Sequence, residues 1–112
     1  MQMKVLLVNG SSRKNGCTNA ALREVERALK EERIETEQLY IGNEALPDCI
    51  ACRKCKEIGR CIFHDSVNEF VDKAKTADGF VFGSPVYFAH PSGRLLTFMD
   101  RAFYAGWGGI SI

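Results

Sequence analysis

The sequence predicts an α/β protein built on a parallel sheet, because strand-like and helix-like segments alternate along its 112 residues. The runs at 4–8 and 79–83 are continuously apolar, which is typical of buried parallel strands. Between the first of these runs and the next strand-like segment, residues 18–32 carry apolar side chains at helical spacing. Parallel strands are joined by crossover helices, so we expect helices on the faces of the sheet.

The first half of the chain is expected to form a strand, a helix and a second strand. The strand over 4–8 ends at Asn9-Gly10. The helix over 18–32 would be capped by Cys17 or Thr18. It would bury one apolar face, made of Ala21, Leu22, Val25, Ala28 and Leu29. Residues 34–41 alternate only weakly and are interpreted as a strand from their position before Gly42-Asn43.

The second half opens with an irregular segment and continues with a helix, a strand and a last helix. Residues 42–65 are longer than the roughly 12–15 residues of an ordinary loop, which indicates a functional segment. The stretch 66–69, S-V-N-E, is a capping box that would start a helix through about Ala74. Another helix is expected from Ser92, with an apolar face made of Leu95, Leu96, Met99, Ala102 and Phe103.

Composition bounds the classes of protein to which the chain can belong. We expect one small domain, 1–112, with a cysteine-rich insertion at 47–65. A hydrophobic share of 46% and a charged share of 26% are ordinary for a globular protein. A net charge of +1 favours neither nucleic acid nor a membrane as partner. The chain has five cysteines and no visible export signal or membrane span, so we expect a cytoplasmic protein whose clustered cysteines are ligands or catalysts.

A polar loop between the first strand and the first helix is a candidate phosphate site. It reads G-S-S-R-K-N-G-C-T-N over 10–19. Backbone N–H groups at a helix N-terminus attract anions. Hydroxyls of Ser11, Ser12 and Thr18, the Asn19 amide and the Arg13 fork would add donors. Neither a Walker loop nor G-x-G-x-x-G is present, so the pattern favours a terminal monophosphate over a pyrophosphate. The alternative is a helix-capping turn that binds nothing.

An aromatic loop, S-P-V-Y-F-A-H-P-S-G over 84–93, follows the third strand. Tyr87 and Phe88 would emerge at the carboxyl end of the strand, where a flat ring ligand could stack on them. The alternative is that both side chains pack on the next helix or in a subunit interface. His90 is interpreted as an exposed loop histidine. In parallel sheets ligands bind at the carboxyl ends of strands, so the two loops are expected to share a site.

Four of the five cysteines lie in one stretch, with the spacing C-x2-C-x2-C-x5-C: Cys49, Cys52, Cys55 and Cys61. Four thiolates at this spacing could surround a 4Fe–4S cluster, with neighbouring basic residues offsetting its negative charge. A zinc ion or four free thiols are the alternatives. Cys17 stands apart from this group.

These motifs together resemble a known family. G-S-S-R-x-x-G-x-T-N after the first strand and G-S-P-V-Y-F-x-x-x-S-G-x-L-x-x-F-M-D-R after the third are similar to the flavodoxin-like NAD(P)H-dependent FMN reductases. The cysteine spacing resembles the iron–sulfur flavoprotein branch of that family. The resemblance runs from Met3 to about Trp107.

The resemblance implies a flavodoxin-like three-layer αβα fold, of which this chain carries three strands in the order 2-1-3. It implies that the FMN phosphate binds at Ser11, Ser12, Arg13, Cys17, Thr18 and Asn19. It also implies that the isoalloxazine ring lies against Pro85, Val86, Tyr87 and Phe88. Asp100-Arg101 matches a helix position of the family to which we assign a structural role.

The function implied is an FMN-dependent oxidoreductase that takes electrons from NAD(P)H. A small molecule or a protein would accept them, through FMN and a possible 4Fe–4S cluster. No side chain stands out as a catalytic acid or base, which fits hydride chemistry on a cofactor. An electron carrier without a nicotinamide site and a structural zinc or thiol module are the alternatives.

The resembling family usually continues for two more strands, so the chain is expected to be a fragment or to be completed by a partner. A small core and an unpaired sheet edge favour a homodimer or homotetramer.

Overall fold

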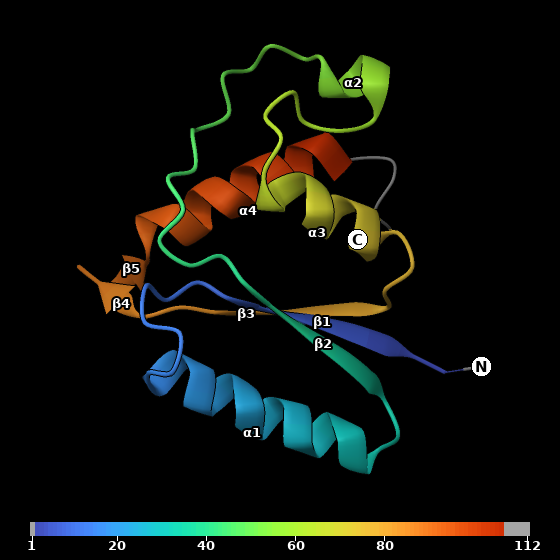
Figure 1. Cartoon of the computed structure of the whole chain (residues 1–112), viewed down its shortest axis with the longest axis vertical. Coiled ribbons are helices and arrows are strands. Elements are labelled where there is room, and N and C mark those ends of the chain that lie inside the picture. Colours follow the sequence, from blue (N-terminus) through green and yellow to red (C-terminus); the bar gives the residue numbers. More distant parts are fainter. Residues whose placement is uncertain (1, 107–112) are drawn as a thin grey trace. The chain divides into compact units, whose positions relative to one another are not determined.

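The structure is a computed structural model that describes residues 2–106, and these divide into two compact units. One unit is formed by residues 2–44 and 77–92, the other by residues 45–76 and 93–106. Figure 1 follows the chain through the elements of both units. The single-domain assignment made from the sequence stays a prediction.

The first unit contains a parallel sheet in the order β2-β1-β3, which confirms the predicted topology. Its strands are β1 (Lys4–Asn9), β2 (Glu35–Tyr40) and β3 (Gly79–Gly83). In the central strand Leu6, Leu7 and Val8 are completely buried. Asn9 is in register with the last residues of both neighbours, so the carboxyl ends of the three strands lie at one edge, as expected.

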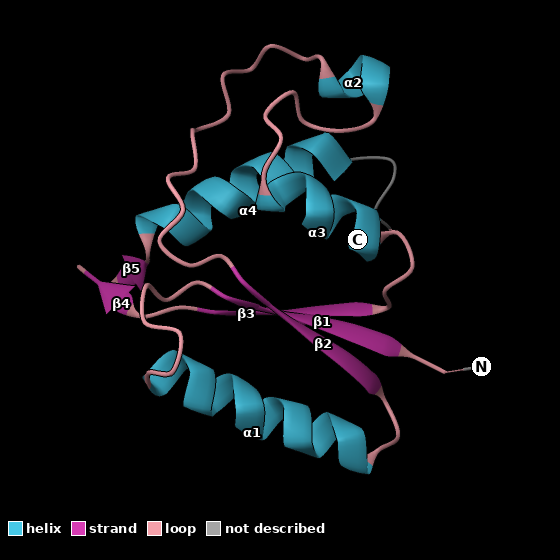
Figure 2. Ribbon diagram, in the orientation of Figure 1, coloured by secondary structure: helices cyan, strands magenta, loops and turns pink. Residues whose placement is uncertain are grey.

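Helix α1 (Cys17–Glu31) lies along one face of this sheet (Figure 2). Leu22 packs against β3, where a Cβ on Gly83 would come within 3.0 Å of it. Leu22 is the only buried residue of the helix, so the predicted apolar face is buried only in part. The predicted cap was wrong, because Gly16 is the N-cap and no side chain bonds to the first turn.

The aromatic loop after β3 contains a small hairpin that the sequence did not predict. Strands β4 (Val86–Tyr87) and β5 (His90–Pro91) pair antiparallel. Phe88 and Ala89 form the turn with positive φ angles of 49° and 64°. Two positive φ values are typical of type I′ turns, which match the twist of paired strands.

The second unit is formed by helices α2 (Cys55–Ile58), α3 (Ser66–Ala74) and α4 (Gly93–Gly106). The rings of Phe70 and Phe98 meet edge to face with centroids 5.3 Å apart. Phe98 and Leu95 are buried, whereas Leu96 of the predicted apolar face is 37% exposed. The N-cap of α3 is Asp65, whose side chain accepts from the Val67 N–H, so the capping box predicted at Ser66 was wrong.

Candidate functional site

The loop after β1 is shaped by the side chain of Asn9, the last residue of the strand. Asn9 is completely buried, and its Oδ1 accepts from the Ser11 N–H at 3.0 Å. The Ser11 hydroxyl oxygen then accepts from the Arg13 N–H at 3.0 Å. Short polar side chains that bond two residues ahead are typical of tight turns. These bonds restrain the start of the loop over 10–19, which we call the phosphate loop. Sequence analysis did not single out Asn9, although a buried strand that ends in Asn is a usable signal.

The start of α1 has the electrostatics of an anion site. The first turn of the helix contains no acidic residue, and no side chain caps its free N–H groups. A helix N-terminus carries roughly half a positive charge, which favours a bound anion. Within residues 2–106 the exposed guanidinium of Arg13 forms no ion pair. Arg13 and the first residues of α1, Cys17 and Thr18, line the same pocket.

The structure brings the phosphate loop and the aromatic loop together at one pocket. The pocket has a volume of about 600 Å³, within the roughly 300–1,000 Å³ of small-molecule sites. From the predicted site residues it collects Ser11, Ser12, Arg13, Cys17, Thr18, Pro85 and Tyr87, and Ser84 joins them. Within the first unit, these residues fit a ligand with a phosphate at one end and a ring at the other.

Three predicted site residues do not line this pocket. The Asn19 side chain accepts from the Gln38 amide at 2.9 Å and lies at a neighbouring polar pocket. Val86 is 73% exposed, and Phe88 is 99% exposed. Their assignment to a flavin site stays a prediction.

The aromatic loop is tied to the sheet through two serines. Ser92 donates its hydroxyl to the Gly10 carbonyl at 3.1 Å, and its N–H bonds to the Ser84 hydroxyl oxygen at 2.8 Å. The Gly10 N–H in turn bonds to the Gly83 carbonyl at 2.8 Å. Both loops therefore share one network of hydrogen bonds at the carboxyl edge of the sheet.

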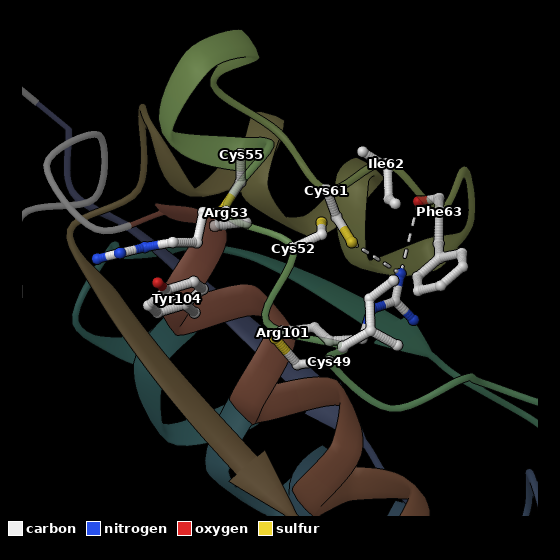
Figure 3. A pocket seen from close by; sticks show the side chains of 11 residues that line it. Cys49, Cys52, Arg53, Cys55, Cys61, Ile62, Phe63, Arg101 and Tyr104 are labelled. Atoms are coloured by element: carbon white, nitrogen blue, oxygen red, sulfur yellow. Dashed lines mark hydrogen bonds between the residues drawn. The ribbon is translucent and has the colours of Figure 1, made fainter.

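The four clustered cysteines line a single pocket in the second unit, together with apolar residues and Arg101 (Figure 3). Cys49 and Cys52 are exposed, whereas Cys55 and Cys61 are half-buried. Among the described residues no histidine or carboxylate lines the pocket, so its metal-ligand set is all sulfur, as in iron–sulfur clusters and four-cysteine zinc sites. The residues present therefore fit a thiolate-bound cluster in their chemistry.

The pocket is, however, smaller than a 4Fe–4S cluster would need. Its volume is about 20 Å³, which is room for roughly one water molecule. Among residues 2–106, no three His, Cys, Asp or Glu side chains converge closely enough to hold a metal ion. The segment between Cys49 and Cys55 would therefore have to move outward to admit a cluster. It contains two residues with positive φ, Ala51 at 54° and Arg53 at 65°, on either side of Cys52.

Cys61 is the best anchored of the four cysteines. The buried side chain of Asn68 accepts from the Cys61 N–H at 3.0 Å and donates to the Cys61 and Phe63 carbonyls at 3.0 Å each. These bonds satisfy the backbone of a segment that forms no helix or strand. Sequence analysis did not single out Asn68, which lies seven residues further along the chain.

Arg101 forms the charged centre of the second unit. Its side chain is completely buried, and both terminal nitrogens bond to the Asp65 carboxylate, at 2.8 and 3.0 Å. Its Nη2 also donates to Cys61 Sγ at 3.5 Å, and its Nη1 donates to the Pro47 carbonyl at 3.2 Å. Burial disfavours the charged form, but the bonds to Asp65 and Cys61 outweigh it, so the pKa of Arg101 lies above its ordinary value.

One polar atom of Arg101 has no acceptor. The buried Nε–H bonds to nothing within the described part of the chain. An unsatisfied buried donor costs about 1–3 kcal/mol. This donor is therefore available to an acceptor that residues 2–106 do not supply, on a side chain whose Nη2 bonds to Cys61 Sγ.

Comparison with known proteins identifies the family. The model of the NADPH-dependent FMN reductase family matches residues 3–110. The chain belongs to this family. None of the helices within residues 2–106 has both the length and the hydropathy needed to cross a membrane.

Its relatives include several iron–sulfur flavoproteins. The chain is 45% identical over 100 residues to one from Methanocaldococcus jannaschii and 30% identical over 100 residues to one from Methanosarcina thermophila. Each match covers 89% of this chain and 52% of the relative. A third, from Clostridioides difficile, is 34% identical over 105 residues, covering 89% of this chain and 46% of the relative. The chain thus spans about half the length of these relatives, and the predicted resemblance is confirmed.

A solved structure confirms the fold class. The NAD(P)H:quinone oxidoreductase from Methanothermobacter marburgensis superposes with a TM-score of 0.72. The match covers 96% of this chain and 56% of the other, at 16% sequence identity. At this identity the likeness establishes the flavodoxin-like fold and nothing about activity.

Proposed function

We propose that this chain carries the FMN site and a 4Fe–4S site of an NAD(P)H-dependent oxidoreductase. The observation that carries the proposal is the pocket that collects the phosphate loop and the aromatic loop in a member of the FMN reductase family. The names of the iron–sulfur flavoprotein relatives support a second cofactor on the four cysteines.

Different residues of the pocket would bind the phosphate and the ring of FMN. Arg13 and the first turn of α1 would bind the phosphate, with Ser11, Ser12 and Thr18 donating hydroxyl bonds. Pro85 and Tyr87 would orient the ring at the other loop. When bound, FMN supplies the hydride and single-electron chemistry, and the chain supplies binding and orientation.

In the second unit Cys49, Cys52, Cys55 and Cys61 would hold the cluster as thiolates. Apolar neighbours such as Ile62 and Phe63 would limit the access of water to it. The electron donor would be NAD(P)H, and the acceptor a small molecule or a protein. We expect no nucleic-acid or membrane partner and a cytoplasmic location.

The first test is the absorption spectrum of protein purified anaerobically without added cofactor, with iron and sulfide assays on the same sample. Flavin bands together with about four irons per chain are expected from a cube held by four thiolates. Flavin without iron would contradict the cluster, and a protein that stays colourless after FMN is added would contradict the flavin site. Steady-state oxidation of NAD(P)H by the loaded protein then tests the donor, since an electron carrier without a nicotinamide site would show almost none.

A single zinc ion on the same four thiols is the second candidate. One ion needs less room than a cube in a pocket of about 20 Å³, but the cysteines would have to move closer together for it too, because no three ligating side chains converge within residues 2–106. Stoichiometric zinc and no visible absorbance from the cysteine site would support this candidate.

We also propose a homodimer or homotetramer. The aromatic ring of Phe88 is 99% exposed at the tip of the β4–β5 hairpin, an unfavourable place for an apolar ring unless another surface covers it. Light scattering coupled to gel filtration tests this, and a monomer at micromolar concentration would contradict it.

A further inference from the structure

We propose that Arg101 is the positioning residue of the cysteine site, holding Cys61 in place and raising the reduction potential of a cluster bound there through an N–H···S hydrogen bond. The inference rests on the proposed cluster. It goes beyond the structural role that sequence analysis assigned to Arg101, because it makes this residue set a measurable property of the cofactor.

The contacts of Arg101 reach both ends of the cysteine segment. At the beginning of the segment its Nη1 donates to the Pro47 carbonyl at 3.2 Å. At the end its Nη2 lies 3.5 Å from both Cys61 Sγ and the Phe63 carbonyl oxygen. The guanidinium also lies over the Phe63 ring, 5.1 Å from its centroid. Figure 3 shows the guanidinium joined to Cys61 and Phe63. One rigid fork therefore fixes the two ends between which the other three cysteines lie.

Asp65, rather than Cys61, sets the orientation of the Arg101 guanidinium. Asp65 binds both terminal nitrogens and is itself fixed as the N-cap of α3. A bidentate carboxylate holds a guanidinium in one plane, which a lysine ammonium cannot reproduce. The N–H that points to Cys61 is therefore preorganised before any cluster binds.

The consequence for a cluster follows from its charge. Each added electron makes the cluster more negative, so a donor that bonds to a ligand sulfur stabilises the reduced form more than the oxidised form. The positive charge of a completely buried guanidinium acts in the same direction. The unpaired Nε–H adds a second donor for which the chain supplies no acceptor within residues 2–106.

The test compares two lysine substitutions in the anaerobically purified full chain. Arg101→Lys keeps the charge and can still pair with Asp65, but a single ammonium cannot reach the carboxylate and Cys61 Sγ together. Arg60→Lys is the matched control, because Arg60 precedes Cys61 in the chain and its Nη2 lies 3.0 Å from both carboxylate oxygens of Asp72 at an exposed site.

The midpoint potential of the cluster is followed by redox titration with EPR detection. Arg101→Lys is expected to disfavour reduction about tenfold, which is about 59 mV for a one-electron couple, and Arg60→Lys less than twofold. An Arg101→Lys protein that keeps its iron and an unchanged potential would overturn the inference. Absence of iron from the wild-type protein would instead remove the proposed cluster, and the inference with it.

If the Arg101→Lys protein loses its cluster or does not fold, a measurement on the wild-type protein tests the inference instead. Protein labelled with ¹⁵N in its arginines and then reduced should show ¹⁵N hyperfine coupling to the cluster by pulsed EPR. This coupling should persist in Arg60→Lys. A wild-type cluster without such coupling would show that no guanidinium bonds to it and would overturn the inference.

Discussion

Arg13 and Arg101, the arginines of the two candidate sites, lie in opposite environments. Their removal is therefore expected to have different effects on ligand binding and on stability. Arg13 is exposed beside the uncapped start of α1, whereas Arg101 is buried and bonded on several sides. An exposed arginine without an ion pair costs little to remove from the free protein, but it is available to a ligand anion. A buried arginine that orients other groups contributes to the folded state itself.

Arg13→Ala is expected to weaken FMN binding about 10- to 100-fold. A charge-assisted hydrogen bond contributes about 1.5–3 kcal/mol, and about 1.4 kcal/mol corresponds to tenfold in affinity. Quenching of flavin fluorescence on titration with the protein measures the dissociation constant. Arg23→Ala is the control, because Arg23 lies on α1, outside the loop that contains Arg13, and lines a different pocket. Equal losses in both variants would argue against a specific phosphate contact.

The Glu24 carboxyl on α1 is expected to titrate below an ordinary glutamate. Hydrogen bonds from Arg27 and its positive charge lower the pKa of Glu24. A depressed folded-state pKa stabilises the fold above the unfolded pKa, and this contribution is lost as the pH falls through the folded value. NMR titration of the side-chain carboxyl should show the shift in wild type and its loss in Arg27→Gln. Because the pair is exposed, salt should reduce the shift.

The two ends of helix α1 differ in how their free backbone groups are bonded. Its N-terminus lacks a side-chain cap. Its C-terminus is closed by two bonds, from the Arg33 N–H to the Lys30 carbonyl at 3.0 Å and from the Ile34 N–H to the Leu29 carbonyl at 3.0 Å. This is a Schellman motif, in which the left-handed position usually holds glycine. Here Arg33 occupies it at φ 62°. The start of the helix is thus left available to a ligand while its end is secured.

Arg33→Gly is expected to stabilise the protein by about 0.5–1 kcal/mol, because glycine adopts positive φ without the steric cost that Arg33 bears. Urea unfolding followed by circular dichroism measures the change. The same substitution inside the helix, Arg23→Gly, should instead destabilise by about 1 kcal/mol. If Arg33→Gly destabilised as much as Arg23→Gly, the left-handed conformation of Arg33 would be contradicted.

At the scale of the whole molecule, each candidate site is built within a single unit. The pocket of the phosphate and aromatic loops takes its lining from residues 11–21 and 84–87. The cysteine pocket takes its lining from residues 49–63 and 101–105. Each unit therefore lines its candidate pocket with residues of its own.

A fourfold variant should separate the two candidate sites. In it serine replaces Cys49, Cys52, Cys55 and Cys61. This variant is expected to lose all bound iron and to bind FMN with an affinity within about twofold of wild type. Serine hydroxyls are poor ligands for iron–sulfur clusters, whereas the pocket of the phosphate and aromatic loops contains none of these residues. Iron assay and flavin titration on the same preparation measure both. A large loss of FMN binding would show that the flavin site depends on the cysteine segment.

Sequence patterns predicted the three strands of the sheet, the helices α1, α3 and α4, and the edge at which the two loops meet. They missed α2, which lies in the segment expected to be irregular, and the β4–β5 hairpin. The apolar runs around Leu6 and Val81 predict buried strands, and their parallel pairing places the loops that follow them at one edge. Local signals also identified the cysteine spacing and the helix that begins at Ser66. These features depend on periodicity within a few residues, which a single sequence contains.

Long-range contacts determine what surrounds Cys61 and how Ser92 ties the aromatic loop to Gly10. Arg101 reaches Cys61 across 40 positions of the chain, and no local pattern encodes a contact of that range. The hairpin at Phe88 and Ala89 was missed because neither residue has the usual preference for positive φ. The partial burial of α1 also depends on packing against the sheet. Local propensity sets the elements, whereas long-range packing and hydrogen bonding select which side chains become the site.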